Sequence, residues 1–272
     1  MFSAGHILFI GISAVVIAAG LWYCNKKRPP IRDVMKVCFA LGLVSELIKV
    51  FDKILIVPVV KPIVENGVLI YLETGQFAPY LEAEHLPFEL CSYQLFFMFF
   101  ALVLTNEKHL KRLHALMYTT CIIGASIALI LASVANDYDT VAEFLGSYSC
   151  WRFFLYHAML VILGVYIGMS NECDIHFKNI KSTTAIIVAL DFVTLYLNSM
   201  MSTPVYSGDD LMGVGNSINY FSSYNNPLGI VMPGKKEWMI YLCIRIVLGL
   251  ICILLVNVPL LLKDRKEGKQ NG

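Results

Sequence analysis

A cysteine and a histidine in two separate apolar stretches of this chain could act as a nucleophile and its base. Proline is tolerated in the first turn of a helix, so we expect the helix of the run 87–105 to begin at Pro87, with Cys91 about one turn inside it. His157 lies within the run 150–170. At ~1.5 Å per helical residue, Cys91 lies ~6 Å and His157 ~10 Å below the starts of their helices, so the two side chains share a layer. A thiolate is the reactive form of cysteine, and an imidazole can accept the thiol proton. The two residues therefore predict nucleophilic catalysis by a Cys–His pair.

Polar side chains on other apolar runs could complete this site. An asparagine or a carboxylate can orient a catalytic imidazole, and Asn198, Asp191 and Glu46 are the candidates. We predict Asn198 as the third catalytic residue. Arg245 lies about two turns into the last apolar run, where its planar guanidinium could pair with Asp191 or Glu46, or receive a lipid phosphate. The predicted substrate-binding residues are Glu46, Gln94, Asp191, Tyr220 and Arg245.

These residues also have purely structural interpretations. A cysteine in a membrane helix is usually a small core side chain, and Glu46 and Lys49 could simply form an i,i+3 ion pair. Cys150 and Cys243 lie in the same layer and are rivals for the nucleophile, and a disulfide on that side of the membrane is a further alternative. The chain has no CxxC or HxxxH pair, so we predict no metal and no other cofactor.

The elements that must position these residues are membrane helices. Hydrophobic residues make up 57% of the 272 residues and charged residues 15%, against roughly 25% charged in soluble domains, and the mean hydropathy is +0.67. A net charge of +1 leaves no basic face for nucleic acid. Runs of ~20 apolar residues predict spans, and seven lie at residues 7–24, 34–51, 87–105, 113–135, 150–170, 182–202 and 238–262. We therefore predict an all-α, multi-pass integral membrane protein with about seven transmembrane helices, which in a bacterium would lie in the plasma membrane.

Basic residues predict the orientation of the spans. Lys and Arg gather in four segments that alternate with acidic loops, at residues 25–28, 108–112, 178–181 and 263–266. Because basic loops stay in the cytoplasm, we predict an N-terminus outside and a cytoplasmic tail, 263–272. The long outer loops are then 53–86 and 203–237. The first is rich in β-branched residues and contains the turn signal Asn66-Gly67, so we expect a hairpin or a re-entrant segment there. Residues 1–272 then form one polytopic domain.

Four stretches, in this order along the chain, resemble one protein family. Leu86-Pro87-Phe88-Glu89-Leu90-Cys91 resembles the LPxxLC signature of YwaF-type integral membrane proteins and their eukaryotic transmembrane relatives. Phe153-Phe154-Leu155-Tyr156-His157 resembles the aromatic-rich helix of that family that ends in histidine, and Leu197-Asn198 resembles its later helix asparagine. Asn219-Tyr220, followed by Pro227, Trp238 and Tyr241, resembles its NY…P…W..Y segment.

This resemblance implies lipid chemistry. The eukaryotic relatives are linked to phospholipid acyl transfer through a Cys–His pair, which implies that Cys91 forms a thioester and that His157 is the base. The expected function is a membrane-embedded acyltransferase or acyl hydrolase in the outer half of the bilayer. Its partners would be a phospholipid or lysophospholipid and a fatty-acyl donor. A non-catalytic lipid-binding or transport protein of the same fold is the alternative. A seven-span receptor is disfavoured because the cytoplasmic ends of the spans carry no polar switch motif.

Overall fold

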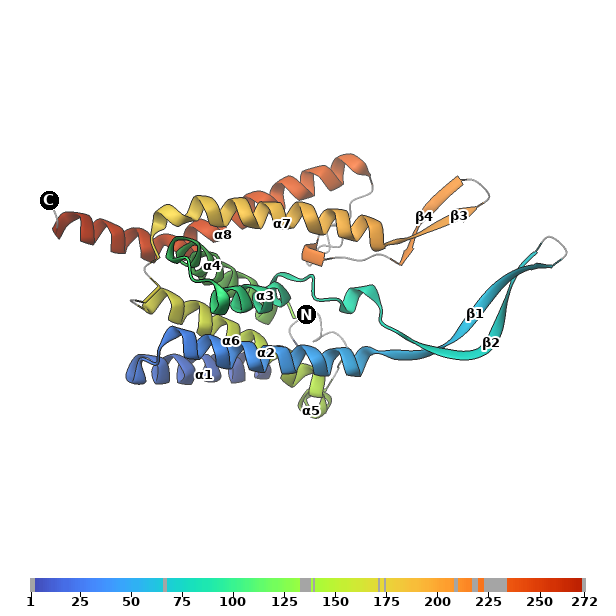
Figure 1. Ribbon diagram of the computed structural model, residues 1–272, viewed down its shortest axis with the longest axis horizontal. Coiled ribbons are helices and arrows are strands. Elements are labelled where there is room, and N and C mark those ends of the chain that lie inside the picture. The colour runs from blue at the N-terminus through green and yellow to red at the C-terminus, as the bar shows by residue number, and fades with distance from the viewer. Residues whose placement is uncertain are drawn as a thin grey trace.

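Seven helices lie along one long axis in the computed structural model, and two β-hairpins project from one end of this bundle (Figure 1). The structure describes residues 3–65, 68–132, 138, 140–170, 172–173, 175–207, 210–216, 220–222 and 234–270. The bundle helices are α1 (Ala4–Lys27), α2 (Ile31–Lys53), α3 (Leu90–Val103), α4 (Glu107–Ile130), α6 (Tyr148–Met169), α7 (Ile180–Met201) and α8 (Lys235–Gln270). The remaining elements are the short helix α5 (Val141–Gly146), the 3₁₀ turns η1 (Ala83–His85), η3 (Phe177–Asn179) and η4 (Tyr220–Ser222), and the strands β1 (Leu55–Glu65), β2 (Val68–Tyr80), β3 (Thr203–Ser207) and β4 (Asp210–Asn216).

Five helices in the described part of the chain are long and apolar enough to cross a membrane: α1, α4, α6, α7 and α8. The protein is therefore an integral membrane protein. Helix α2 lies outside this group, because charged residues such as Glu46 and Lys49 interrupt its apolar run. Helix α3 is apolar but has 14 residues, about 21 Å at 1.5 Å per residue, against a hydrocarbon core of about 30 Å. A count of seven spans, and their orientation, stay predictions.

Helices α4 and α6 form the centre of the bundle. Helix α4 packs against α3, α6, α7 and α8, and helix α6 packs against α1, α2 and α4. Glycine allows the close approach of the two central helices, because a Cβ atom at Gly164 would lie 2.9 Å from Cys121 Cβ and 3.2 Å from the backbone nitrogen of Ile122. One turn further along α6, a Cβ at Gly168 would lie 2.5 Å from the Tyr118 ring. Anything larger than hydrogen at these two positions would push α4 and α6 apart.

Side-chain caps fix several helix starts. The side chains of Ser3, Asn106 and Ser147 accept hydrogen bonds from the backbone N–H groups three residues later, at the starts of α1, α4 and α6. At the start of α3 the sequence prediction was wrong. We expected Pro87 in the first turn, but the helix begins at Leu90 with Glu89 as its N-cap. Cys91 is therefore the second residue of α3 rather than a full turn inside it.

The prediction of an all-α protein is also incomplete, because the chain forms two hairpins. Strands β1 and β2 pair antiparallel from Leu55↔Tyr80 to Glu65↔Val68, which confirms the hairpin predicted in the segment 53–86. The predicted turn Asn66-Gly67 lies outside the described residues. Strands β3 and β4 form a second hairpin in the loop 203–237, which the sequence did not predict. In Figure 1 both hairpins extend from the same end of the bundle, opposite the C-terminus.

Candidate functional site

Cys91 lies at the N-terminus of α3, where the first backbone N–H groups have no acceptor within the helix. The first backbone bond of the helix runs from Tyr93 N–H to Glu89 O, at 3.0 Å. The Glu89 side chain makes no capping hydrogen bond, so the N–H groups beside Cys91 have no partner from this cap. The Cys91 side chain is half-buried. A Cβ atom at Gly124 on α4 would lie 3.6 Å from the Cys91 sulfur, so this glycine leaves room next to the thiol.

A hydrogen bond from α6 ties the helix of His157 to Cys91. The Tyr156 hydroxyl donates to the backbone oxygen of Cys91 at 2.8 Å. Tyr156 directly precedes His157, so this contact brings the predicted base and nucleophile into one region of the bundle. The rings of Tyr156 and His157 also meet edge to face, with centroids 5.5 Å apart.

The His157 ring has a defined proton arrangement. Its Nδ1 lies 2.7 Å from the backbone oxygen of Phe153, and a carbonyl oxygen can only accept, so Nδ1 carries the hydrogen. In the neutral ring Nε2 then holds the lone pair of a base. No hydrogen bond joins His157 to Cys91 within the residues that the structure describes. The nucleophile–base pair therefore stays a prediction, supported by the hydrogen bond from Tyr156 to the Cys91 backbone.

Gln94 lies one turn below Cys91 and is fully buried. Its amide nitrogen donates to Thr120 Oγ1 at 2.9 Å, and its amide oxygen accepts from Cys121 Sγ at 3.1 Å. Both ends of the amide are therefore engaged with α4. These bonds connect α3 to α4 at the centre of the bundle. The contact of Gln94 with a substrate stays a prediction.

Asn198 and Glu46 are bonded to groups other than the imidazole. The Asn198 amide donates to Tyr220 O and accepts from Tyr220 N, both at 3.0 Å. Glu46 forms the i,i+3 ion pair with Lys49 that the sequence allowed. The role of Asn198 as third catalytic residue stays a prediction, but its observed bonds serve to hold the turn η4 against α7.

An ion pair between Arg245 and Asp191 joins α8 to α7. Arg245 Nη2 lies 2.6 and 2.7 Å from the two carboxylate oxygens of Asp191, and Arg245 Nη1 donates to Phe221 O at 2.5 Å. Asp191 was one of the two partners expected from the sequence. Because the guanidinium holds both a helix carboxylate and the turn η4, Arg245 joins α7, α8 and η4.

The turn η4 covers the start of α3. The Tyr220 ring is buried, packs edge to face on Phe88 with centroids 5.6 Å apart, and its hydroxyl donates to Ala83 O. Phe221 has a left-handed backbone, φ 58°, and its ring lies edge to face on Tyr93, with centroids 6.2 Å apart. Tyr220 is thus a structural anchor next to the segment that carries Cys91. Asn219 and Pro227, which belong to the same motif, lie outside the described residues.

A family model for the TMEM164 family matches residues 1–257. The chain belongs to the TMEM164 family. No curated protein and no solved structure shows significant similarity to it.

The other thiols of this TMEM164 family member separate into buried and exposed groups. None of the eight cysteines, all of which lie among the described residues, forms a disulfide. Cys150, one rival nucleophile, is fully buried, and Cys243, the other, lies on an exposed face of α8. Cys91 is half-buried, and its backbone oxygen accepts the hydrogen bond from Tyr156 on the helix of His157. No group of three or more His, Cys, Asp or Glu side chains that could hold a metal occurs among the described residues.

Three residues of this site were missed by sequence reasoning. Tyr156 stands inside the quoted aromatic motif, next to His157, but nothing in the sequence indicates that its hydroxyl reaches α3. Gly124 lies in an apolar run without a motif, so nothing in the sequence marks it. Phe221 directly follows the predicted Tyr220 but was not itself predicted. Only the contact of Tyr156 with α3, the packing of α3 against α4, and the contacts of Phe221 with Tyr93 and Arg245 show what these residues do.

Proposed function

We propose that this TMEM164 family protein is a membrane-embedded acyltransferase or acyl hydrolase that carries acyl groups on Cys91. The observation that supports the proposal is the hydrogen bond from Tyr156 to the Cys91 backbone, because Tyr156 is the residue next to His157 on α6. The LPxxLC resemblance supports the same chemistry. We also propose that the chain is related to YwaF-type proteins and to eukaryotic acyltransferases.

In the first half of the reaction, His157 Nε2 takes the thiol proton as the Cys91 sulfur attacks the ester carbonyl of a donor phospholipid. Collapse of the tetrahedral intermediate breaks the carbon–oxygen bond. The leaving lysophospholipid oxygen takes the proton back from His157, and the acyl group stays on Cys91 as a thioester.

In the second half, the hydroxyl of an acceptor lysophospholipid gives its proton to His157 and attacks the thioester. The carbon–sulfur bond breaks, and the sulfur recovers a proton from His157. Water in place of the lysophospholipid gives hydrolysis. No external oxidant, reductant or metal is needed in either half.

The uncapped start of α3 supports this mechanism. The negative oxygen of each tetrahedral intermediate needs donors at the nucleophile, and the backbone N–H groups of Cys91 and Ser92 lie in the first turn of a helix without a side-chain cap. Donors of this kind also benefit from the positive end of the helix dipole. Tyr156 would hold the Cys91 backbone in position relative to α6.

The proposed setting is a seven-span topology with the N-terminus outside and the basic tail in the cytoplasm. Cys91 would then lie near the outer surface, where a phospholipid or lysophospholipid could reach it. The pair Arg245–Asp191 is assigned to holding η4 over this region rather than to binding a head group, because its guanidinium is already engaged on both sides.

A non-catalytic lipid-binding or transport role is the second candidate. The observation that favours it is the hydrogen bond of His157 to Phe153 in its own helix, together with no bond from His157 to Cys91 among the described residues. Catalytic hydrogen bonds often tighten only when substrate is bound, so the two candidates are distinguished by chemistry at the thiol.

Labelling with an activated acyl-chain probe tests the proposal. We expect an adduct on wild-type protein that hydroxylamine removes, as it removes thioesters, and no adduct on Cys91→Ser. Cys150→Ser and Cys243→Ser are the matched controls and should label like wild type. Labelling of His157→Ala should be slow near neutral pH and partly recover at alkaline pH, where a thiol ionises without a base. An unchanged adduct on Cys91→Ser would overturn the assignment, and saturable lipid binding without any adduct would favour the lipid-binding role.

A further inference from the structure

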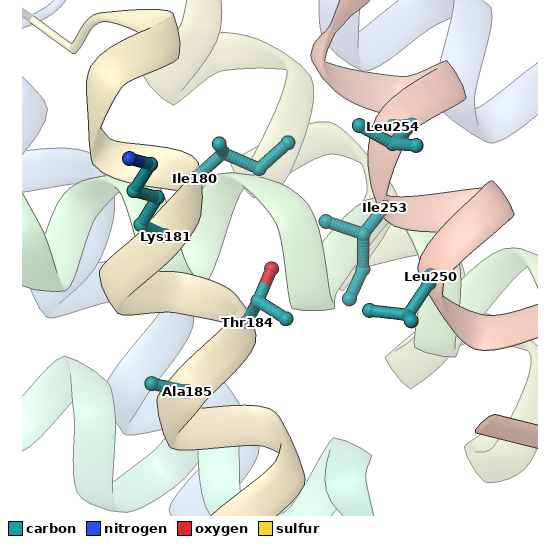
Figure 2. Close-up of a pocket in the computed structure, with 7 residues that line it drawn as sticks. All are labelled: Ile180, Lys181, Thr184, Ala185, Leu250, Ile253 and Leu254. Atoms are coloured by element: carbon teal, nitrogen blue, oxygen red, sulfur yellow. The ribbon is translucent and has the colours of Figure 1, made fainter. Parts of the chain in front are cut away.

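A groove between α7 and α8 lies at the end of the bundle opposite the hairpins. Its volume is about 440 Å³, and its lining residues are Ile180, Lys181, Thr184, Ala185, Leu250, Ile253 and Leu254. In Figure 2 the side chains of Leu250 and Ile253 point from α8 toward Thr184 on α7. Six of the seven lining residues carry no charge, so the groove suits an apolar occupant with one charged end.

Two ties hold the helices on either side of this groove. Arg245 and Asp191 join α8 to α7 at one end. At the other end, Asp264 of α8 accepts from Phe177 N–H at 2.9 Å and lies 2.7 Å from His176 Nδ1. Between these two contacts, the Thr184 side chain points from α7 toward α8, whereas the Ala185 side chain points away from it (Figure 2). The groove is therefore a fixed feature of the helix pair rather than a gap between independent helices.

Positive charge gathers at one end of the groove. Lys181 lines it and is exposed, and Lys178 lies one turn earlier on the same segment, also exposed. The end of α8 is tied to this segment through Asp264 and adds further basic residues, namely Lys263, Arg265 and Lys266. The one carboxylate among them, Asp264, is already engaged by His176 and Phe177. The mouth of the groove is thus basic while its body is apolar.

We propose that this groove binds an anionic phospholipid, with an acyl chain against Ile253 and Leu254 and the phosphate at Lys181. A groove on hydrophobic helices opens to lipid chains, and lysine reaches head-group phosphates from there because its apolar stem can lie along the helix. Basic residues at a helix end attract anionic lipids of the adjacent leaflet, which the sequence predicts to be the cytoplasmic one. This site lies at the opposite end of the bundle from Cys91 and does not rest on the acyl-transfer proposal.

Native mass spectrometry of the full chain, extracted from nanodiscs that contain equal amounts of phosphatidylglycerol and phosphatidylcholine, tests the site. Wild-type protein should retain phosphatidylglycerol preferentially. Lys181→Ala should lower that retention roughly fivefold, since one lysine near anionic lipid contributes about 1 kcal/mol. Thr184→Phe, at a side chain that points from α7 toward α8 in Figure 2, should fill the groove and remove retained lipid. Lys27→Ala, at the end of α1 away from the groove, is the matched control and should behave as wild type.

Four results would overturn the site. The first three are equal retention of the two lipids, an equal loss in Lys27→Ala, which would indicate diffuse surface charge, and full retention in Thr184→Phe. Displacement of phosphatidylglycerol by inorganic phosphate would also contradict the proposal, because the apolar body would then contribute nothing. Thermal unfolding confirms that each variant is folded. Acyl labelling of Cys91 should stay unchanged in Lys181→Ala, so failure here is distinguishable from failure of the proposed function.

Discussion

The replacement of Arg245 with Met should destabilise the fold by about 4 kcal/mol. Its guanidinium lies 2.6 and 2.7 Å from the two Asp191 oxygens, and the two side chains are 18% and 17% exposed. Leaving one member of such a buried pair alone costs about 3–5 kcal/mol, and the partial exposure puts this pair at the lower end. The lost bond to Phe221 O adds about 1 kcal/mol. The assay is chemical unfolding of purified protein in detergent.

The double variant Arg245→Met with Asp191→Leu separates pairing from packing. Replacing both charges by apolar groups is often nearly neutral, so we expect it to recover most of the stability and to lack only the bond that holds Phe221. A double variant as unstable as Arg245→Met alone would refute this account of the pair. A folded Arg245→Met protein with wild-type stability but without phospholipid binding would refute it in another way, by showing that Arg245 serves a head group.

Three further outcomes are expected. Gly164→Ala should destabilise the bundle by about 1–3 kcal/mol in the same unfolding assay, because its added carbon meets α4. Gly249→Ala is the control and should not destabilise the bundle, because nothing lies within 4 Å of a Cβ atom there. Equal losses of stability in the two variants would contradict the packing account. Tyr156→Phe removes a bond of about 1 kcal/mol and should slow acyl labelling of Cys91 several-fold without unfolding the protein; unchanged kinetics would exclude a positioning role. Burial raises the pKa of Cys173, in the connection between α6 and α7, to about 12, so the thiol stays protonated at neutral pH and should resist N-ethylmaleimide until the protein is denatured. Rapid alkylation of the native protein at pH 7 would show that this pKa is wrong.

The helices were largely predictable because the length of each apolar run can be read directly from the sequence. Each of the seven predicted runs falls on a helix of the structure, and the segment 53–86 forms the hairpin that its β-branched residues indicate. The start of α3 was not predictable in this way. Pro87 is compatible with a first helical turn, but the segment before Leu90 instead packs under η4, where Tyr220 contacts Phe88 and Ala83. That contact joins residues more than a hundred positions apart, which local patterns do not record.

The candidate site was predictable at the level of residue types but not of partners. Depth arithmetic placed Cys91 and His157 in one layer, and the structure connects their helices through Tyr156. The same arithmetic could not show that Asn198 would bond the backbone of Tyr220. An amide side chain bonds whichever partner the tertiary packing presents, so its spacing on α7 gives its face and not its function.

The central claim is that Cys91 carries an acyl group during lipid turnover, and the most direct test is peptide mass spectrometry after incubation with natural lipids. Purified protein would be given a phospholipid with an isotopically labelled acyl chain, quenched in acid, and digested. The account predicts the labelled acyl mass on the peptide that contains Cys91, and loss of that mass when an acceptor lysophospholipid is added, as the chain appears on the acceptor. Transfer of the labelled chain with no acyl mass on Cys91, or with the mass on Cys150 or Cys243, would contradict it.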